Sequence, residues 1–142
     1  MREISFRGKR EDNGEWVEGN LFIPDLPNKP TQICMGTNVV RITFDVDPET
    51  VGQFTGLTDK NGTNIFEGDV VKNHLGIKQL VIFENGCFFF IEPIDYIYGE
   101  RQGENFYACD KKYKDFEMCI TEDEVIGNIH DNPEWVRKEE DI

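Results

Sequence analysis

Three carboxylates are the side chains of this sequence whose type and spacing could do chemistry. Asp59, Glu67 and Asp69 follow one another closely, with Thr55, Thr58 and His74 around them. Carboxylates grouped in this way can hold a divalent metal or exchange protons with a substrate. The same residue types also build turns, because Asp side chains accept hydrogen bonds from nearby backbone N–H groups. We predict the structural role, with Asp59 folded over its own turn and Asp69 bonded to main-chain donors.

The remaining reactive side chains match no catalytic or metal-binding motif. Neither His74 nor His130 has a Ser or Cys partner at a motif spacing, and no glycine-rich phosphate loop precedes a helix. The four cysteines contain no Cys-x-x-Cys pair; they are Cys34, Cys87, Cys109 and Cys119. A zinc site made by Cys109, Cys119 and His130 would have an unusual spacing. We therefore expect no catalytic residue, metal or cofactor, with reduced thiols and Cys87 as a small core side chain.

The formal net charge of −13 disfavours general binding to DNA or RNA. Arg7, Lys9 and Arg10 form a short basic group, which we expect to be a solvated strand end or turn. Mimicry of a nucleic acid is a second interpretation of the acidic charge. No apolar run approaches the ~20 residues that span a membrane, and no apolar signal segment precedes the first expected strand. We therefore expect a cytoplasmic protein.

Turn residues divide the chain into short β-strands. The strands are expected at 3–7, 16–23, 32–34, 39–44, 51–55, 79–83, 87–91 and 124–129, with another beginning at Val70-Val71. Asn61-Gly62 and Asn85-Gly86 are predicted to be tight two-residue hairpin turns, and Gly56 to end its strand. Gly19 indicates a bulge or a close backbone approach. Helix is expected as a turn at 48–50 and as a short segment that Asn132-Pro133 would start. Residues 92–123 have room for one further short strand or helix.

The hairpin at Asn85-Gly86 predicts a sheet that is apolar on both faces. Strand alternation puts one set on one face (Val81, Phe83, Phe88 and Phe90) and a second set on the other (Leu80, Ile82, Cys87, Phe89 and Ile91). A sheet with one wetted face would alternate with polar residues instead. Cover must come from the N-terminal strands, the residue 93–118 loop or a second subunit. The interface of a homo-oligomer would then include Phe88, Phe89 and Phe90.

These elements predict a mainly β fold in one domain of two small lobes, residues 1–142. Strands of residues 1–50 would pack beside a small SH3-like antiparallel barrel of residues 51–130. Residues 92–123 lose the regular pattern and are expected to form an insertion or long loop in the second lobe. A charged tail follows at 131–142.

Five segments, in order, carry a family resemblance. They are 2–7, 16–22, 52–62, 65–71 and 125–133, and they include Trp16-Val17-Glu18-Gly19 and Gly52-Gln53-Phe54-Thr55-Gly56-Leu57. Together they resemble the YopX-like proteins encoded by phages and prophages of Gram-positive bacteria. The resemblance implies a mainly β fold and a mobile-element origin, and it transfers no catalytic residue to this chain. Its motif residues are read as structural: Trp16, Gly19, Gly52, Gly56, Asp59, Asn61, Gly62, Phe66, Gly68 and Asp69.

The leading functional hypothesis is a non-enzymatic, prophage-encoded accessory protein in the cytoplasm of its bacterial host. Its partner would be another protein or further copies of itself. One alternative is an acidic nucleic-acid mimic that inhibits a host DNA-binding protein. A weaker alternative is a small metal-dependent hydrolase or nuclease using Asp59, Glu67 and Asp69.

Overall fold

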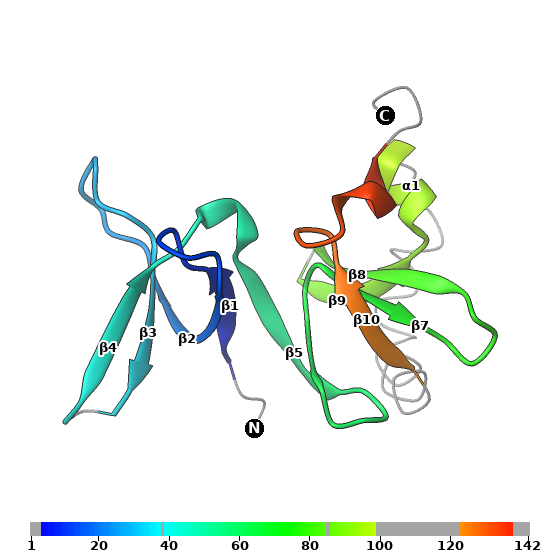
Figure 1. Cartoon of the computed structure of the whole chain (residues 1–142), viewed down its shortest axis with the longest axis horizontal. Helices are drawn as coiled ribbons and strands as arrows, with labels where there is room; N and C mark the ends of the chain where they lie inside the picture. Colours follow the sequence, from blue (N-terminus) through cyan, green and yellow to red (C-terminus); the bar gives the residue numbers. More distant parts are fainter. Residues whose placement is uncertain (1–3, 38, 85, 99–122, 138–142) are drawn as a thin grey trace. The chain divides into compact units, whose positions relative to one another are not determined.

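The structure, a computed structural model, describes residues 4–37, 39–84, 86–98 and 123–137 (Figure 1). The chain divides into two compact units, Met1–Gly56 and Leu57–Ile142. We expected the division after residue 50. It falls later because the strand that follows residue 50 pairs with the first strand of the chain, through Phe6 with Gln53.

The first unit is a meander of antiparallel strands followed by a single turn of 3₁₀ helix. The elements are β1 (Phe6–Lys9), β2 (Trp16–Phe22), β3 (Gln32–Gly36), β4 (Arg41–Asp45), η1 (Pro48–Thr50) and β5 (Gly52–Thr58). Their sheet has the order β4-β3-β2-β1-β5-β6, in which β6 (Asn64–Phe66) follows β5 in the chain. The predicted hairpin of the first two strands is confirmed, with Arg7 opposite Glu18.

The core of the first unit forms where the end of β1 reaches β4. Arg10 pairs with Val46 as an isolated antiparallel bridge, and the Glu11 N–H donates to the Asp45 carbonyl at 3.0 Å. Val46 and Ile33 are completely buried there. Gly8 makes the approach feasible, because an added Cβ would lie 3.0 Å from the Val46 Cβ.

The second unit is built on a four-stranded antiparallel sheet of order β10-β7-β8-β9. The strands of this sheet are β7 (Asp69–Lys72), β8 (Lys78–Glu84), β9 (Cys87–Ile91) and β10 (Glu124–Asn128). The helical elements of the unit are α1 (Pro93–Tyr98) and η2 (Pro133–Val136). Within the predicted insertion of residues 92–123, the structure describes residues 92–98, which include α1, and Asp123. No helix among the described ranges is long and apolar enough to cross a membrane.

The two-sided burial of the β8–β9 hairpin is confirmed. Its register pairs Glu84 with Cys87 and Phe83 with Phe88, as a two-residue turn at Asn85-Gly86 requires; Asn85 itself lies outside the described residues. One face packs with Ile65, Val71, Leu57 and Val125. The other packs with Val70, Tyr96, Ile126, Ile129, Trp135 and Val136. The second unit thus supplies its own cover on both faces.

This burial argues against the homo-oligomer interface expected at Phe88, Phe89 and Phe90. Phe88 and Phe89 are only 5% and 6% exposed, and Phe90 is half-buried. These rings are covered by residues of the same chain, so they offer little surface to a second copy. A surface for partners has to be sought elsewhere on the molecule.

Three local predictions need correction. The Asn61-Gly62 segment is a five-residue connection between β5 and β6, because the Asp59 N–H donates to the Thr63 carbonyl and closes a wider loop at 2.9 Å. Gly56 does not end its strand; it lies inside β5 with φ of 86°. Asn132 precedes η2 without a side-chain capping bond to it.

The turn glycines yield a first testable prediction. Gly62 and Gly86 have φ of 82° and 79°, and a Cβ added at either would meet nothing within 4 Å. Only backbone strain therefore opposes a side chain, and Gly62→Val and Gly86→Val should each lower stability by about 1–2 kcal/mol. Thermal melts by circular dichroism would measure this, with Thr58→Val as a control in an extended conformation. An unchanged melting temperature would mean that the glycine is not held at positive φ.

The mainly β prediction is confirmed, since antiparallel sheets dominate both units. The described residues form two sheets and no closed barrel.

Candidate functional site

Asp59 is the centre of the signature segment and links it to the last strand. Its side chain is buried, with 6% exposed. Oδ1 accepts hydrogen bonds from the N–H groups of Asn61 (2.8 Å) and Thr63 (2.9 Å). Oδ2 accepts one from the Val125 N–H at 2.9 Å, across 66 residues of sequence. The predicted turn role of Asp59 is confirmed, and the long-range bond to β10 adds to it.

These three donors also set the charge state of Asp59. Burial raises the pKa of the carboxyl, but the backbone hydrogen bonds from Val125, Thr63 and Asn61, with a smaller effect of Lys60, outweigh it and lower the pKa overall. A carboxyl with a lowered pKa stays ionised and is a poor general acid near neutral pH. The site therefore favours a structural anion.

Asp69 performs the same task at the next turn. Its side chain is 1% exposed, and Oδ2 accepts a hydrogen bond from the Phe66 N–H at 2.8 Å. Between them Gly68 has φ of 93°, a conformation that an L side chain rarely adopts. The Gly68 N–H donates to Val81, and its carbonyl accepts from Ile129. The predicted turn before a strand is thus confirmed, and it ties together β7, β8 and the end of β10.

The carboxylates form no metal centre in the part of the chain that the structure describes, where no group of three or more His, Cys, Asp and Glu side chains could hold an ion. Glu67 is half-buried, whereas Thr58 and His74 are exposed and Thr55 is 1% exposed. We expect a thermal-shift screen with magnesium, manganese, calcium and zinc to show no saturable stabilisation, since an ion that binds only the folded form raises its melting temperature. A saturable shift that Asp69→Asn abolishes would contradict this prediction.

The closing segment holds a polar cluster that we did not predict from the sequence. Asn128 Oδ1 accepts hydrogen bonds from the N–H groups of His130 (3.0 Å) and Asp131 (2.9 Å). Asn132 Oδ1 accepts from the Asn128 N–H at 3.3 Å. A Cβ at Gly127 would come too close to Asn132 Oδ1 and would meet the Trp135 ring at 2.9 Å. The signal was present as a Gly-Asn pair shortly before Asn-Pro, but it was interpreted as a strand end and a helix cap.

The basic group of the first unit is structural, and the expectation of a solvated strand end is wrong for Arg7. Its side chain is buried, with 9% exposed, and the guanidinium lies 4.5 Å from the centroid of the Trp16 ring. Lys9 Nζ lies 5.5 Å from the same ring. Arg7 and Trp16 share a face because Lys9 is opposite Trp16 in the register of the first hairpin.

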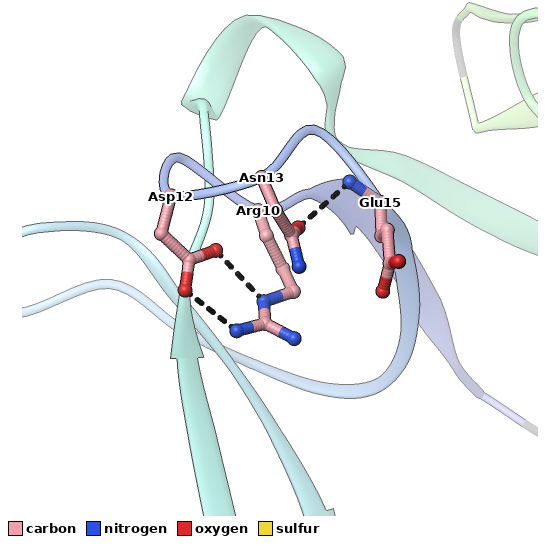
Figure 2. A network of polar contacts seen from close by, with 4 residues as sticks. All are labelled: Arg10, Asp12, Asn13 and Glu15. Carbon is pink, nitrogen blue, oxygen red and sulfur yellow. Dashed lines mark hydrogen bonds and ion pairs between the residues drawn. The ribbon is translucent and has the colours of Figure 1, made fainter.

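Arg10 belongs to the turn of that hairpin (Figure 2). Its guanidinium donates to both oxygens of Asp12, at 2.9 and 2.6 Å, and lies 4.6 Å from the centroid of the Phe44 ring. The hydrogen bond lowers the pKa of Asp12 and raises the pKa of Arg10. Asn13 Oδ1 accepts from the Glu15 N–H at 2.9 Å and completes the turn. Arg10 is thereby engaged with its own turn and is a weak candidate for a phosphate contact.

An open hollow of about 700 Å³ lies on the second unit. It is lined by Lys60, Lys72, Asn73, His74, Leu75, Gly76 and Glu124. Lys60 and Glu124 are 3.7 Å apart across it, and both are half exposed. An exposed ion pair of this kind holds little energy and fixes no geometry. The hollow has charged walls without a buried polar group that would select a ligand.

Apolar side chains are exposed mainly on one part of the first unit. Seven of the ten large hydrophobic residues that are exposed among the described residues fall between residues 22 and 42: Phe22, Ile23, Leu26, Met35, Val39, Val40 and Ile42. Their exposed fractions run from 39% for Met35 to 91% for Val39. Phe22 lies opposite Gln32 at one end of β3, whereas Val39 and Val40 follow its other end, so the exposed apolar side chains are spread along this hairpin and the loop before it. Single exposed apolar residues are ordinary on a surface, and it is their number in this segment that makes it a candidate for contact with a partner.

Comparison with known proteins finds a matching family and a solved structure of similar fold. A sequence model described as YopX protein matches residues 5–137, most of the chain. The chain belongs to the YopX family. A crystal structure of protein EF1440 from Enterococcus faecalis has a similar fold, with a TM-score of 0.50 and 22% sequence identity over 96% of this chain and 100% of that chain. No curated protein matches the sequence.

The motif residues of the YopX family member all have packing or backbone roles. Trp16 carries the two cationic side chains of β1, and Gly52 is buried opposite Arg7. A Cβ at Gly19 would collide with the Cys34 carbonyl, so the predicted close backbone approach is confirmed. Phe66 is 2% exposed in the core of the second unit. The prediction that these motif residues are structural is therefore consistent with their contacts and backbone conformations.

The cysteines depart from the expected state at one position. The Cys34 thiol is free, whereas Cys87 is disulfide-bonded, so the expectation of reduced thiols is wrong for Cys87. Cys87 packs on one apolar face of the β8–β9 hairpin, in line with the core role expected for it. Cys109 and Cys119 lie outside the described residues, and with them the zinc site considered with His130.

Proposed function

We propose that this YopX family member is a non-enzymatic accessory protein that acts through protein–protein contacts. The observation that carries the proposal is the concentration of exposed apolar side chains between residues 22 and 42. Burying one such side chain contributes about 1.5–3 kcal/mol, so a few of them can drive a specific contact. The buried carboxylates support the same conclusion, because Asp59 and Asp69 are committed to backbone donors.

We infer further that the protein is encoded by a prophage and works in the cytoplasm of the bacterial host. The resemblance of its motifs to phage and prophage proteins supports this inference. We also propose that the second unit is a variant of the SH3-like barrel, supported by its short antiparallel strands and tight turns. An experimental structure in which β10 does not pair with β7 would contradict that architecture.

A pull-down from host cytoplasm tests the function. The full chain, tagged and immobilised, should capture a host protein that mass spectrometry identifies and that binds directly once purified. The double variant Phe22→Ser with Leu26→Ser should lose the captured protein, since it removes two side chains that are 55% and 64% exposed. The matched control is Leu75→Ser with Ile77→Ser, which alters exposed residues of the second unit. Equal capture by both double variants would overturn the role of the first unit.

The nucleic-acid mimic remains a second candidate because the acidic charge is concentrated. Residues 1–56 carry six Lys or Arg and nine Asp or Glu, a formal charge of −3, whereas residues 57–142 carry nine and nineteen, a charge of −10. A mimic would present such charge to a DNA-binding protein. If the captured host protein binds DNA and an added duplex displaces it, the mimic replaces our first proposal.

The charge also predicts that the protein itself does not bind duplex DNA. The net charge is −13, and two of the three residues of the N-terminal basic group are engaged, Arg7 with Trp16 and Arg10 with Asp12, so this group is a poor site for phosphates. Fluorescence anisotropy with a random duplex at physiological salt should show no binding at micromolar protein. Micromolar affinity that weakens with added salt would disprove this expectation.

A further inference from the structure

One margin of the first sheet is only partly paired. β4 is the terminal strand of its sheet and contacts β3 on one side, with Ile42 opposite Met35 and Thr43 opposite Cys34 (Figure 1). Its other side is occupied at one end, where the Glu11 N–H donates to the Asp45 carbonyl. Among the described residues, the stretch of this edge that has no strand beside it is 41–44.

The ladder between β3 and β4 shows which backbone groups face outward. The Thr37 N–H donates to the Val40 carbonyl at 2.7 Å, and the Val46 N–H donates to the Thr31 carbonyl at 3.0 Å. Hydrogen-bonded pairs alternate along an antiparallel ladder, so the even-numbered residues of β4 bond to β3. The N–H and C=O groups of Arg41 and Thr43 therefore point away from β3, toward the free edge.

This edge is protected by charge only at its two ends, Arg41 and Asp45. Natural edge strands are guarded by charges, prolines or bulges. Residues 31–44 contain a single charged side chain, Arg41, in a protein in which 30% of residues are charged. Ile42 is 53% exposed, and the neighbouring turn exposes Val39 and Val40. Between the charged ends of β4, Ile42, Thr43 and Phe44 form an uncharged, unpaired stretch that can act as a template for another strand.

We propose that the free edge of β4 pairs antiparallel with β4 of a second copy of this chain, about a two-fold axis at Ile42. The inference rests on the proposed function and names the partner of one part of its surface. The axis places Arg41 of each copy opposite Thr43 of the other, so their outward groups can form four hydrogen bonds. The Ile42 side chains become neighbours, and the Met35–Ile42 pair continues into its counterpart across the axis.

The length of the edge fixes this register. An axis at Thr43 would set Arg41 against Asp45 of the second copy, a favourable charge pair. That arrangement is obstructed, because Glu11 already lies against the Asp45 carbonyl. With the axis at Ile42, Val40 meets Phe44 of the second copy, and the chain turns away just beyond, between Thr37 and Val40.

Charge favours the same surface for self-association. Two copies of a chain with −13 repel each other, yet residues 1–56 account for only −3 of this charge. Among the described residues, Arg41 is the only charged side chain of the segment 41–44, and it faces Thr43 of the second copy. The contact is short, below the roughly 1,200 Å² of a stable complex, so the dimer should be weak and reversible. Added salt should strengthen it, since salt screens the repulsion.

Sedimentation equilibrium of the full chain provides the first test. The dimer fraction should rise with protein concentration, and Ile42→Asp should abolish it by facing two carboxylates directly. Leu75→Asp is the matched control, because Leu75 is 70% exposed on the second unit. Circular dichroism checks that both variants fold. A strict monomer at millimolar wild-type protein, or a dimer that survives Ile42→Asp, would overturn the proposal.

Disulfide cross-linking tests the register. At a non-hydrogen-bonded antiparallel pair the Cα atoms lie about 4.5 Å apart, within disulfide reach. In a Cys34→Ser background, which removes the thiol opposite Thr43, Ile42→Cys should form a linked dimer under mild oxidation and Thr43→Cys should not. Cys34→Ser alone reports links made by other cysteines. Preferential linking of Thr43→Cys would overturn the axis at Ile42. If dimerisation fails while the pull-down succeeds, this inference falls and the proposed function stands.

Discussion

Gly19→Ala is expected to destabilise the first unit by about 3 kcal/mol, near the top of the range for overpacking. A Cβ at this position would lie far inside van der Waals contact of the Cys34 carbonyl oxygen, and it would also press on Ile33. The carbonyl belongs to β3, which is held by β4 on its far side, so it cannot yield without disturbing the ladder. The strands β2 and β3 must separate, and the completely buried Ile33 loses contacts.

Chemical denaturation followed by tryptophan fluorescence measures this effect, because Trp16 lies on β2. Gly14→Ala is the matched control: Gly14 has φ of 74° and nothing lies within 4 Å of an added Cβ. Backbone strain alone should cost the control about 1 kcal/mol. If both variants lose the same stability, the close approach of Gly19 to β3 does not exist in solution.

The β8–β9 hairpin shows what the sequence can predict. Its strands are joined by a two-residue turn, so the turn alone sets the register, and alternation then assigns every side chain to a face. The prediction used only residues close together in the chain. What covers those faces could not be predicted, since Ile129, Trp135 and Val136 come after the insertion and nothing local ties them to β9.

The errors at Asn61-Gly62 and Arg7 have a related cause. A two-residue turn follows from local propensity, but the Asp59 carboxylate accepts hydrogen bonds from both Asn61 and Thr63 and holds a wider loop. Arginine is usually a surface residue, yet the Arg7 guanidinium packs on Trp16 of the next strand. In both places a specific side-chain contact, the hydrogen bonds of Asp59 or the stacking of Arg7 on Trp16, outweighs the local preference of the residue type.

The sequence predicted that the carboxylates of the candidate site are structural, but it did not predict their long-range contacts. The structural assignment of Asp59 and Asp69 followed from turn chemistry, and the structure confirms it. The bond from Val125 to Asp59 spans 66 residues, and no local pattern reports it. The strands of the β3–β4 hairpin were predicted, but the position of β4 at the edge of its sheet was not, because it depends on a strand order that no local pattern encodes.

Asp59→Ala is expected to lower the free energy of unfolding by about 1–3 kcal/mol, because it removes the buried acceptor of three backbone donors, on the exposed Asn61 and Thr63 and the half-buried Val125. Asp59→Asn separates two contributions. Its single oxygen can still accept from Asn61 and Thr63, but its amide then presents N–H groups to the Val125 N–H. The link to β10 should fail while the turn survives, so the asparagine variant should lose less stability than the alanine variant. Hydrogen exchange at Val125 would report the broken link directly.

The pH dependence of stability shows whether Asp59 stabilises the fold through its charge or only through its packing. The hydrogen bonds lower the pKa of Asp59 in the folded protein, so its stabilising effect is complete above the unfolded value of about 4 and disappears as the pH falls through the folded pKa. The stability difference between wild type and Asp59→Asn should therefore be constant from pH 8 to pH 5 and should narrow in more acidic solution. Other carboxylates titrate in both proteins, so the difference isolates Asp59. A gap that stays constant to pH 3 would show that the charge of Asp59 does not stabilise the fold.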